Sequence, residues 1–210
     1  MITENTNLKS AFFNRKLKSA FFLMASIYFM VAEFISAVFT NRPLIEVYTQ
    51  HTISALGVPF ATIGFSPLYH LMNSGFIALG IFLILGCVFG LNEKMRRYKK
   101  PYNILVAITS LGLFIIAFIH AGDSFHQIGA LMAIVGGGLL LMTIAIGVEA
   151  SKNYKIACLI LGVMAIGFLM LMIYFMGNPS LEIIEAIPER ISVYSLILWS
   201  FITGIMIIKE

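Results

Sequence analysis

One run of the sequence decides the fold: residues 125–148 read FHQIGALMAIVGGGLLLMTIAIGV, without a single Asp, Glu, Lys or Arg. A helix of about 20 predominantly apolar residues crosses the hydrocarbon core of a bilayer, so this run predicts a membrane-spanning helix. Five other runs meet the same length criterion. The predicted spans are Leu17–Thr40, Tyr69–Leu91, Tyr102–Ala121, Phe125–Val148, Tyr154–Met176 and Pro188–Ile208.

The overall composition indicates the same class of protein. Of the 210 residues, 60% are hydrophobic and only 11% are charged, and the mean hydropathy is +0.94. A soluble domain of this size could not hide so much apolar surface, so lipid must cover much of the exterior. The first run is long enough to span rather than to serve as the apolar part of a cleaved signal peptide. We therefore expect an all-α polytopic membrane protein, a bundle of six transmembrane helices that forms a single domain over residues 1–210.

The basic residues orient the predicted spans. Twelve of the fourteen Lys and Arg residues lie at the termini or in the second and fourth connections, and only Arg42 and Arg190 lie on the other side. Cytoplasmic loops carry an excess of Lys and Arg, so we expect both termini to be cytoplasmic. These residues also account for the net charge of +4. A basic face of this kind indicates contact with anionic lipids rather than with nucleic acid.

The opposite, outer side carries most of the polar residues that could form a site. All four histidines and six of the ten acidic residues lie there or in the outer half of a span. Ionisable groups at membrane depth are costly and usually mark a functional site. The residues concerned are His51, His70, His120, His126, Glu33, Glu46, Asp123, Glu182, Glu185 and Glu189.

Glu33 is the only carboxylate well inside an apolar run. It shares one helical face with Ser26, Ser36 and Thr40, because these residues are spaced three, four or seven apart. A carboxylate at that depth must face the bundle and either find a partner or take up a proton. Two roles are therefore open for Glu33: a functional role, including a catalytic one, or a structural hydrogen bond or ion pair.

Arg190 is a basic residue at the outer end of the last span, against the charge rule. We expect it to pair with one of three carboxylates, Glu33, Asp123 or Glu189. Glu189 also suits the positive end of the helix dipole. Tyr194 follows Arg190 by one helical turn and therefore lies on the same face.

The turn from His120 to His126 is the densest polar cluster in the sequence. Asp123 lies between the two histidines. We expect it to cap the following helix by accepting a hydrogen bond from the backbone N–H of His126, or to orient an imidazole. With His70, these three residues form a candidate zinc set, although the spacing is not a standard zinc motif. The sequence favours a hydrogen-bonding role over metal binding, and Asp123 is a second catalytic candidate beside Glu33.

Small residues recur at spacing four in two spans, at Gly86 and Gly90 and again at Gly129, Ala133 and Gly137. Such stripes let helices approach closely in lipid, within one chain or in a homo-oligomer. Internal packing is the favoured interpretation, with the fourth span central to the bundle. The two cysteines, Cys87 and Cys158, are expected to be packing residues.

Four short motifs follow one another between Thr40 and Trp199. They are ISALG at 53–57, NSG at 73–75, HQIGA at 126–130 and ERISVY at 189–194. Together they resemble the bacterial membrane family DUF998, six-helix proteins of unassigned activity that are distantly similar to the DRAM and Sfk membrane proteins. The resemblance implies the six-span fold, a bacterial cytoplasmic membrane and an important outer cluster, but it supplies no reaction. The family positions in this chain are Ser54, Gly57, Asn73, His126, Glu189 and Arg190.

A fainter pattern occurs in the first span, where AEF at 32–34 is followed by Ser36. It is similar to the first helix of alkaline ceramidases, which are zinc-dependent membrane amidases. Those enzymes have seven spans and an HxxxH motif in the last one. This chain has six predicted spans and no histidine in the last.

Three functions are compatible with these residues. In the first, an outward-facing pocket binds or moves a lipid headgroup or small amphiphile, and its ligand-binding residues are Glu33, Asn73, His126, Glu189, Arg190 and Tyr194. Arg190 would meet an anionic group of that ligand.

The second function is a zinc-dependent intramembrane hydrolase that acts on a lipid-like substrate. Its metal ligands would be His70, His120, His126 and Asp123, with Glu33 as general base on a bound water. The third is a structural or regulatory membrane subunit, whose polar cluster only ties the helices together.

Overall fold

The structure is a computed structural model that describes residues 2–59, 66–178, 184 and 186–209, with side chains from Asn14 onward. Glu182 and Glu185 lie outside the described residues. Six of the described helices are long and apolar enough to cross a membrane, which confirms the predicted number of spans. Each predicted end lies within three residues of the observed one.

The six spanning helices run in sequence order, and two of them have distinctive ends. The first, α1, continues back beyond its membrane span Asn14–Val38. The second, α4, extends through a π-helical turn at Cys87–Leu91 and a 3-10 turn to Lys94. Their bounds are α1 Ile2–Val38, α4 Tyr69–Gly86, α5 Lys99–Phe118, α6 Ser124–Gly147, α7 Lys152–Met176 and α8 Ala186–Lys209.

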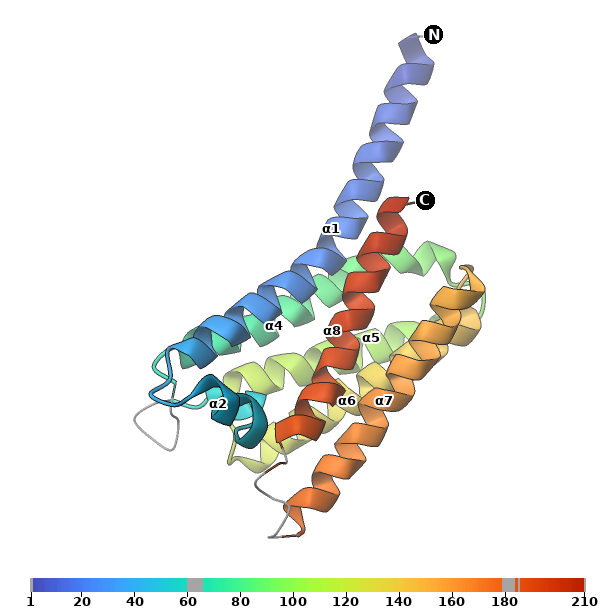
Figure 1. Cartoon of the computed structure of the whole chain (residues 1–210). Helices are drawn as coiled ribbons and strands as arrows, with labels where there is room; N and C mark the ends of the chain where they lie inside the picture. Colours follow the sequence, from blue (N-terminus) through green and yellow to red (C-terminus); the bar gives the residue numbers. More distant parts are fainter. Residues whose placement is uncertain (1, 60–65, 179–183, 185, 210) are drawn as a thin grey trace.

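The helices form a closed ring in which each span packs against the next one in the sequence. The ring closes because α8 packs against α1, and α6 also touches α8. Figure 1 shows both termini at the same end of the bundle, as six antiparallel spans require. We call the opposite end the distal end. Of the six membrane windows, that of α6 is the most buried, and α6 is in contact with three other spans, α5, α7 and α8.

Close contacts between glycines bring the helices of the ring together. A Cβ added at Gly112 of α5 would lie 2.6 Å from the backbone oxygen of Gly129 in α6, and one at Gly138 would lie 2.9 Å from that of Gly162 in α7. Backbones pass directly over each other at such crossings, as expected for small residues in lipid. The stripe that includes Gly129 therefore serves packing within the chain. Cys87 and Cys158 are both buried, and neither forms a disulfide.

In the described part of the connection between α1 and α4, which the sequence predicts only as a long loop, the chain forms two short helices. They are α2 (Leu44–Gln50) and α3 (Ile53–Leu56). Figure 1 shows α2 at the distal end, where it lies close to the start of α8. We call residues 44–57 the cap, because this segment covers the ends of α1 and α8.

Candidate functional site

The centre of the distal end is an ion pair between α1 and α8. Arg190 Nε donates to Glu33 Oε1 at 3.2 Å, and the hydroxyl of Tyr194 donates to Glu33 Oε2 at 2.7 Å. The Glu33 side chain is fully buried and that of Arg190 is 5% exposed. Of the three carboxylates predicted to pair with Arg190, Glu33 is therefore the partner. A buried ion pair is stable only when further hydrogen bonds satisfy its remaining atoms, and Tyr194 supplies one of them.

The cap supplies the other contacts of Arg190. Its Nη1 donates to the backbone oxygen of His51 at 2.6 Å, and its guanidinium carbon lies 4.7 Å from the centre of the Tyr48 ring. Such stacking of a cation over an aromatic face is attractive. Burial, together with the negative charge of Glu33, raises the pKa of Tyr48. Arg190 Nη2 is buried and has no hydrogen-bond partner among the described residues.

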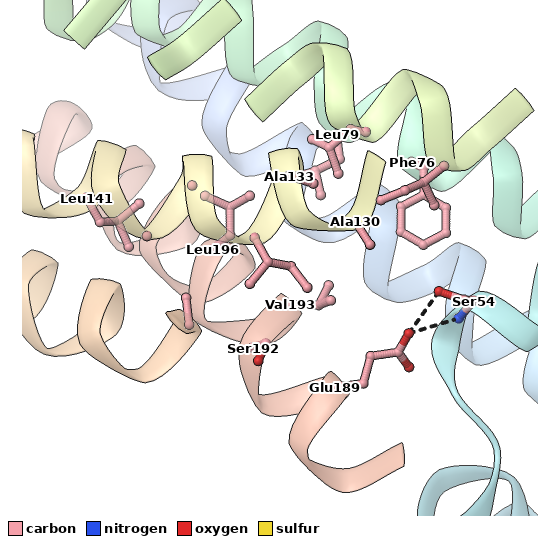
Figure 2. A pocket seen from close by; sticks show the side chains of 16 residues that line it. Ser54, Phe76, Leu79, Ala130, Ala133, Leu141, Glu189, Ser192, Val193 and Leu196 are labelled. Atoms are coloured by element: carbon pink, nitrogen blue, oxygen red, sulfur yellow. Dashed lines mark hydrogen bonds between the residues drawn. The ribbon is translucent and has the colours of Figure 1, made fainter. Parts of the chain in front are cut away.

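Glu189, one residue earlier, holds the beginning of α3. Its carboxylate accepts from the backbone N–H of Ile53 at 2.5 Å, from the Ser54 hydroxyl at 2.8 Å and from the Ser54 N–H at 3.4 Å. Figure 2 shows Glu189 turned toward Ser54, with two of these bonds drawn. The first N–H groups of a helix lack partners within it, so a buried carboxylate there both satisfies them and is stabilised by them.

Asn73 of α4 fixes the other end of α3. Its side-chain nitrogen donates to the backbone oxygen of Gly57 at 3.0 Å. A Cβ on Gly57 would collide with the Asn73 amide. A glycine is therefore required for this close approach. Five residues of the motifs singled out in the sequence thus share one structural role, which is to hold the cap on the bundle: Ser54, Gly57, Asn73, Glu189 and Arg190.

A small cavity lies inside the ring next to Glu189. Its volume is about 30 Å³, which is room for water but not for an amphiphile. Figure 2 shows Phe76, Ala130, Val193 and other mostly apolar residues around it. Its polar lining consists of Ser54, Glu189 and Ser192. The hydroxyl of Ser192 is buried without a partner among the described residues.

The hairpin between α5 and α6 is separate from this cluster. His126 is buried, and its Nδ1 lies 2.6 Å from the backbone oxygen of Ile119, where α5 has ended. Its Nε2 has no partner in the described part of the chain. Asp123 caps α6 as predicted, but the predicted bond is wrong: its carboxylate accepts from Phe125 N–H, while His126 N–H donates to the Asp123 backbone oxygen. An N-cap side chain can accept from the second or the third N–H of its helix, and Asp123 accepts from the second.

The other predicted zinc ligands face different surroundings. His120 is exposed and bonds locally to the backbone oxygen of Ala121, while the ring of His70 packs against that of Tyr69 at 3.8 Å between centres. Within the described ranges, no three His, Cys, Asp or Glu side chains are grouped to hold a metal ion. The zinc set of His70, His120, His126 and Asp123 stays a prediction.

Two contacts of Arg190 could not be predicted from the sequence. The backbone oxygen of His51 carries no residue-specific signal, because every residue has one. Tyr48 is one of eight tyrosines, and nothing in its spacing distinguishes it. Only the fold of the cap brings both to Arg190.

The fold and the site define the protein as a polytopic membrane protein, a six-helix bundle with a buried ion pair under a helical cap. The chain belongs to the family described as "Protein of unknown function (DUF998)", which matches residues 23–206. The resemblance inferred from the motifs is thereby confirmed. No curated protein and no solved structure matches the chain. The fainter similarities to DRAM, Sfk and alkaline ceramidase proteins are not shown by these comparisons.

Proposed function

We propose that this protein binds the headgroup of an amphiphile at its distal end, with Arg190 as the residue that contacts it. The observation that carries the proposal is the buried Nη2 of Arg190, which has no hydrogen-bond partner among the described residues. Buried donors without partners are rare in proteins, and each is costly. An acceptor oxygen of a bound headgroup would satisfy this one.

The contacts around Arg190 suit it to such a role. Glu33 and the backbone oxygen of His51 hold the guanidinium from two sides, so its orientation is fixed before a ligand arrives. Fixed donors bind more tightly because no ordering cost remains to be met. Since the Glu33 carboxylate already balances the charge of Arg190, a phosphate, a carboxylate or an ester oxygen would each serve as the acceptor.

In this proposal most of the remaining candidate residues support Arg190 or the cap. Tyr194 and Glu33 position the guanidinium, and Glu189 and Asn73 hold the cap beside it. His126 lies on the face of α6 that lines the small cavity, one helical turn from Ala130. The asymmetry of Lys and Arg supports a site on the outer side of a bacterial cytoplasmic membrane, with both termini cytoplasmic.

The test is a thermal-shift measurement on purified, delipidated protein. Added lysophosphatidylglycerol should raise the Tm of the wild-type protein, and monoacylglycerol tests whether an uncharged oxygen suffices. The informative variant is Arg190→Lys, which keeps a cation beside Glu33 but lacks the planar fork and its free donor. Arg42→Lys, in the solvent-accessible pair with Glu46, is the matched control.

The proposal predicts a shift in the wild-type and Arg42→Lys proteins and its loss in Arg190→Lys. An equal shift in all three proteins would overturn it, as would the absence of any shift with both lipids. The second result would favour the structural role, in which the cluster only ties the helices and the cap together.

A further inference from the structure

An open groove runs along the outside of the bundle between α1 and α8. Its volume is about 410 Å³, within the range of about 300–1,000 Å³ that is usual for small-molecule sites. The hydroxyl of Ser26 is occupied by the backbone oxygens of Phe22 and Ile197, so the groove presents an apolar surface. The residues that line it are Ser26, Ile27, Met30, Val31, Tyr194, Ile197, Leu198 and Phe201.

The groove leads directly to the polar cluster at the distal end. Tyr194 belongs to both, because it lines the groove and donates to Glu33. On α8, Arg190, Tyr194 and Leu198 follow one another at spacing four and so lie on one helical face. On α1, Met30 precedes Glu33 by three residues, which also places them on one face. The Glu33–Arg190 pair therefore lies about one helical turn beyond the distal end of the groove.

This arrangement has the two parts that an amphiphile requires. An apolar groove within the membrane span reaches Tyr194, and the buried cation Arg190, with its unused donor, lies one helical turn beyond. From Tyr194 to Phe201 the groove follows α8 for about 10 Å, at the rise of an α-helix. That length covers part of one leaflet of a bilayer whose hydrocarbon core is about 30 Å thick. A molecule whose headgroup reaches Arg190 would therefore have its chain beside Tyr194 and Leu198.

We infer that the groove between α1 and α8 holds the acyl chain of a membrane lipid whose headgroup oxygen binds Arg190. The inference rests on the proposed function and makes it more specific: the ligand is a lipid of the same leaflet, not a water-soluble compound. Packing of the acyl chain in the groove and the hydrogen bond from Arg190 to the headgroup make separate contributions to the binding free energy. The two parts can therefore be removed independently.

The experiment compares two lysophosphatidylglycerol probes, one tetradecanoyl and one hexanoyl, on the purified full-length protein. The groove is filled by Leu198→Trp, and the headgroup donor is removed by Arg190→Lys. Leu159→Trp on α7 is the matched control, because Leu159 is 48% exposed and Leu198 is 49% exposed. Of these two leucines, Leu198 lines the groove and Leu159 does not. Binding is measured by titration with a fluorescent lipid that the probes displace.

Leu198→Trp should weaken binding of the tetradecanoyl probe by at least about tenfold, or 1.4 kcal/mol, and leave that of the hexanoyl probe within about twofold. Arg190→Lys should weaken both probes. If Leu198→Trp and Leu159→Trp bind the long probe equally well, the inference is wrong while the proposed headgroup site stands. If Arg190→Lys binds both probes as the wild type does, or if the wild type binds neither, the proposed function fails and the inference with it.

Discussion

Two arginine–carboxylate pairs at opposite ends of the bundle have the same chemistry and opposite surroundings. At the distal end Arg190 and Glu33 are 3.2 Å apart, with side chains 5% and 0% exposed. At the end that carries the termini, Arg96 and Glu149 are only 2.5 Å apart, but their side chains are 71% and 63% exposed. The shorter bond belongs to the pair whose loss should matter less. Burial, not distance, decides the consequence of breaking an ion pair.

The physical reason is the fate of the partner that is left behind. When an exposed pair is broken, water solvates both groups and little is lost. When a buried pair is broken, the remaining charge cannot reach water. The distal pair therefore has to be held in place from several directions, by Tyr194, by the backbone of His51 and by the Tyr48 ring. A site of this kind is also preorganised for a ligand.

The largest effect is expected for Arg190→Ala. Glu33 would remain buried without its cation, and such a loss costs about 3–5 kcal/mol of folding stability. Arg96→Ala at the exposed pair should cost only about 0–1 kcal/mol. Unfolding in detergent micelles with increasing denaturant measures both. Equal destabilisation by the two substitutions would show that burial does not separate the pairs.

A smaller but clear effect is expected for Glu189→Gln. The amide replaces an acceptor oxygen with a donor that faces the N–H groups of Ile53 and Ser54, and each lost bond to a charged group costs about 1.5–3 kcal/mol. Amide hydrogen exchange at Ile53 and Ser54 should become faster, since these are the N–H groups that the carboxylate accepts from. Glu149→Gln is the exposed control. Unchanged exchange in Glu189→Gln would show that the cap does not depend on this carboxylate.

Glycines at packed and at open positions should also respond differently to substitution. Gly112→Ala would force a Cβ against the backbone oxygen of Gly129, and overpacking of this kind costs about 1–3 kcal/mol. Gly167 on α7 has nothing within 4 Å of the added Cβ, so Gly167→Ala should stabilise the helix by up to about 1 kcal/mol. Thermal unfolding in micelles distinguishes the two signs. A destabilised Gly167→Ala protein would contradict the assignment of that position to the open, lipid-facing side.

The smallest effect is expected for the solvent-accessible pair of Arg42 and Glu46. The hydrogen bond from Arg42 lowers the pKa of Glu46, with a further contribution from His51. Because the pKa is lower in the folded protein, this stabilisation exists above the pKa of the unfolded chain and is lost as the pH falls through the folded value. Arg42→Ala should raise the pKa of Glu46 toward its ordinary value. Carbon-13 NMR of the labelled carboxylate would detect this change. An unchanged titration of Glu46 would show that Arg42 does not stabilise its carboxylate.

The sequence predicted the fold well because the bilayer imposes a length criterion that each span must satisfy. It also predicted the most consequential contact of the site as one of three options. Glu33 and Arg190 each violated a rule, one as a carboxylate inside an apolar run and the other as a cation on the side with few basic residues. Charged side chains within the membrane are costly unless they are paired, and the sequence contains few other charged residues at the depth of Glu33 and Arg190.

The sequence could not predict what the cap does. The sequence of the 41–67 connection lacks a long run with the apolar periodicity of a helix. Its helices α2 and α3 are stabilised by tertiary contacts, such as the hydrogen bonds of Glu189 at the start of α3. The turn around Asp123 was predicted as a site because its polar residues are adjacent in the sequence. Adjacency in sequence does not bring side chains to one point, and there His126 bonds to the backbone of Ile119 instead.

Native mass spectrometry of protein extracted from membranes tests whether Arg190 binds a lipid headgroup. We expect the wild-type and Arg42→Lys proteins to retain one bound lipid in gentle detergent. Arg190→Lys, shown to be folded by its thermal transition, should not retain it. The same lipid adduct, retained to the same extent in Arg190→Lys, would contradict this role of Arg190.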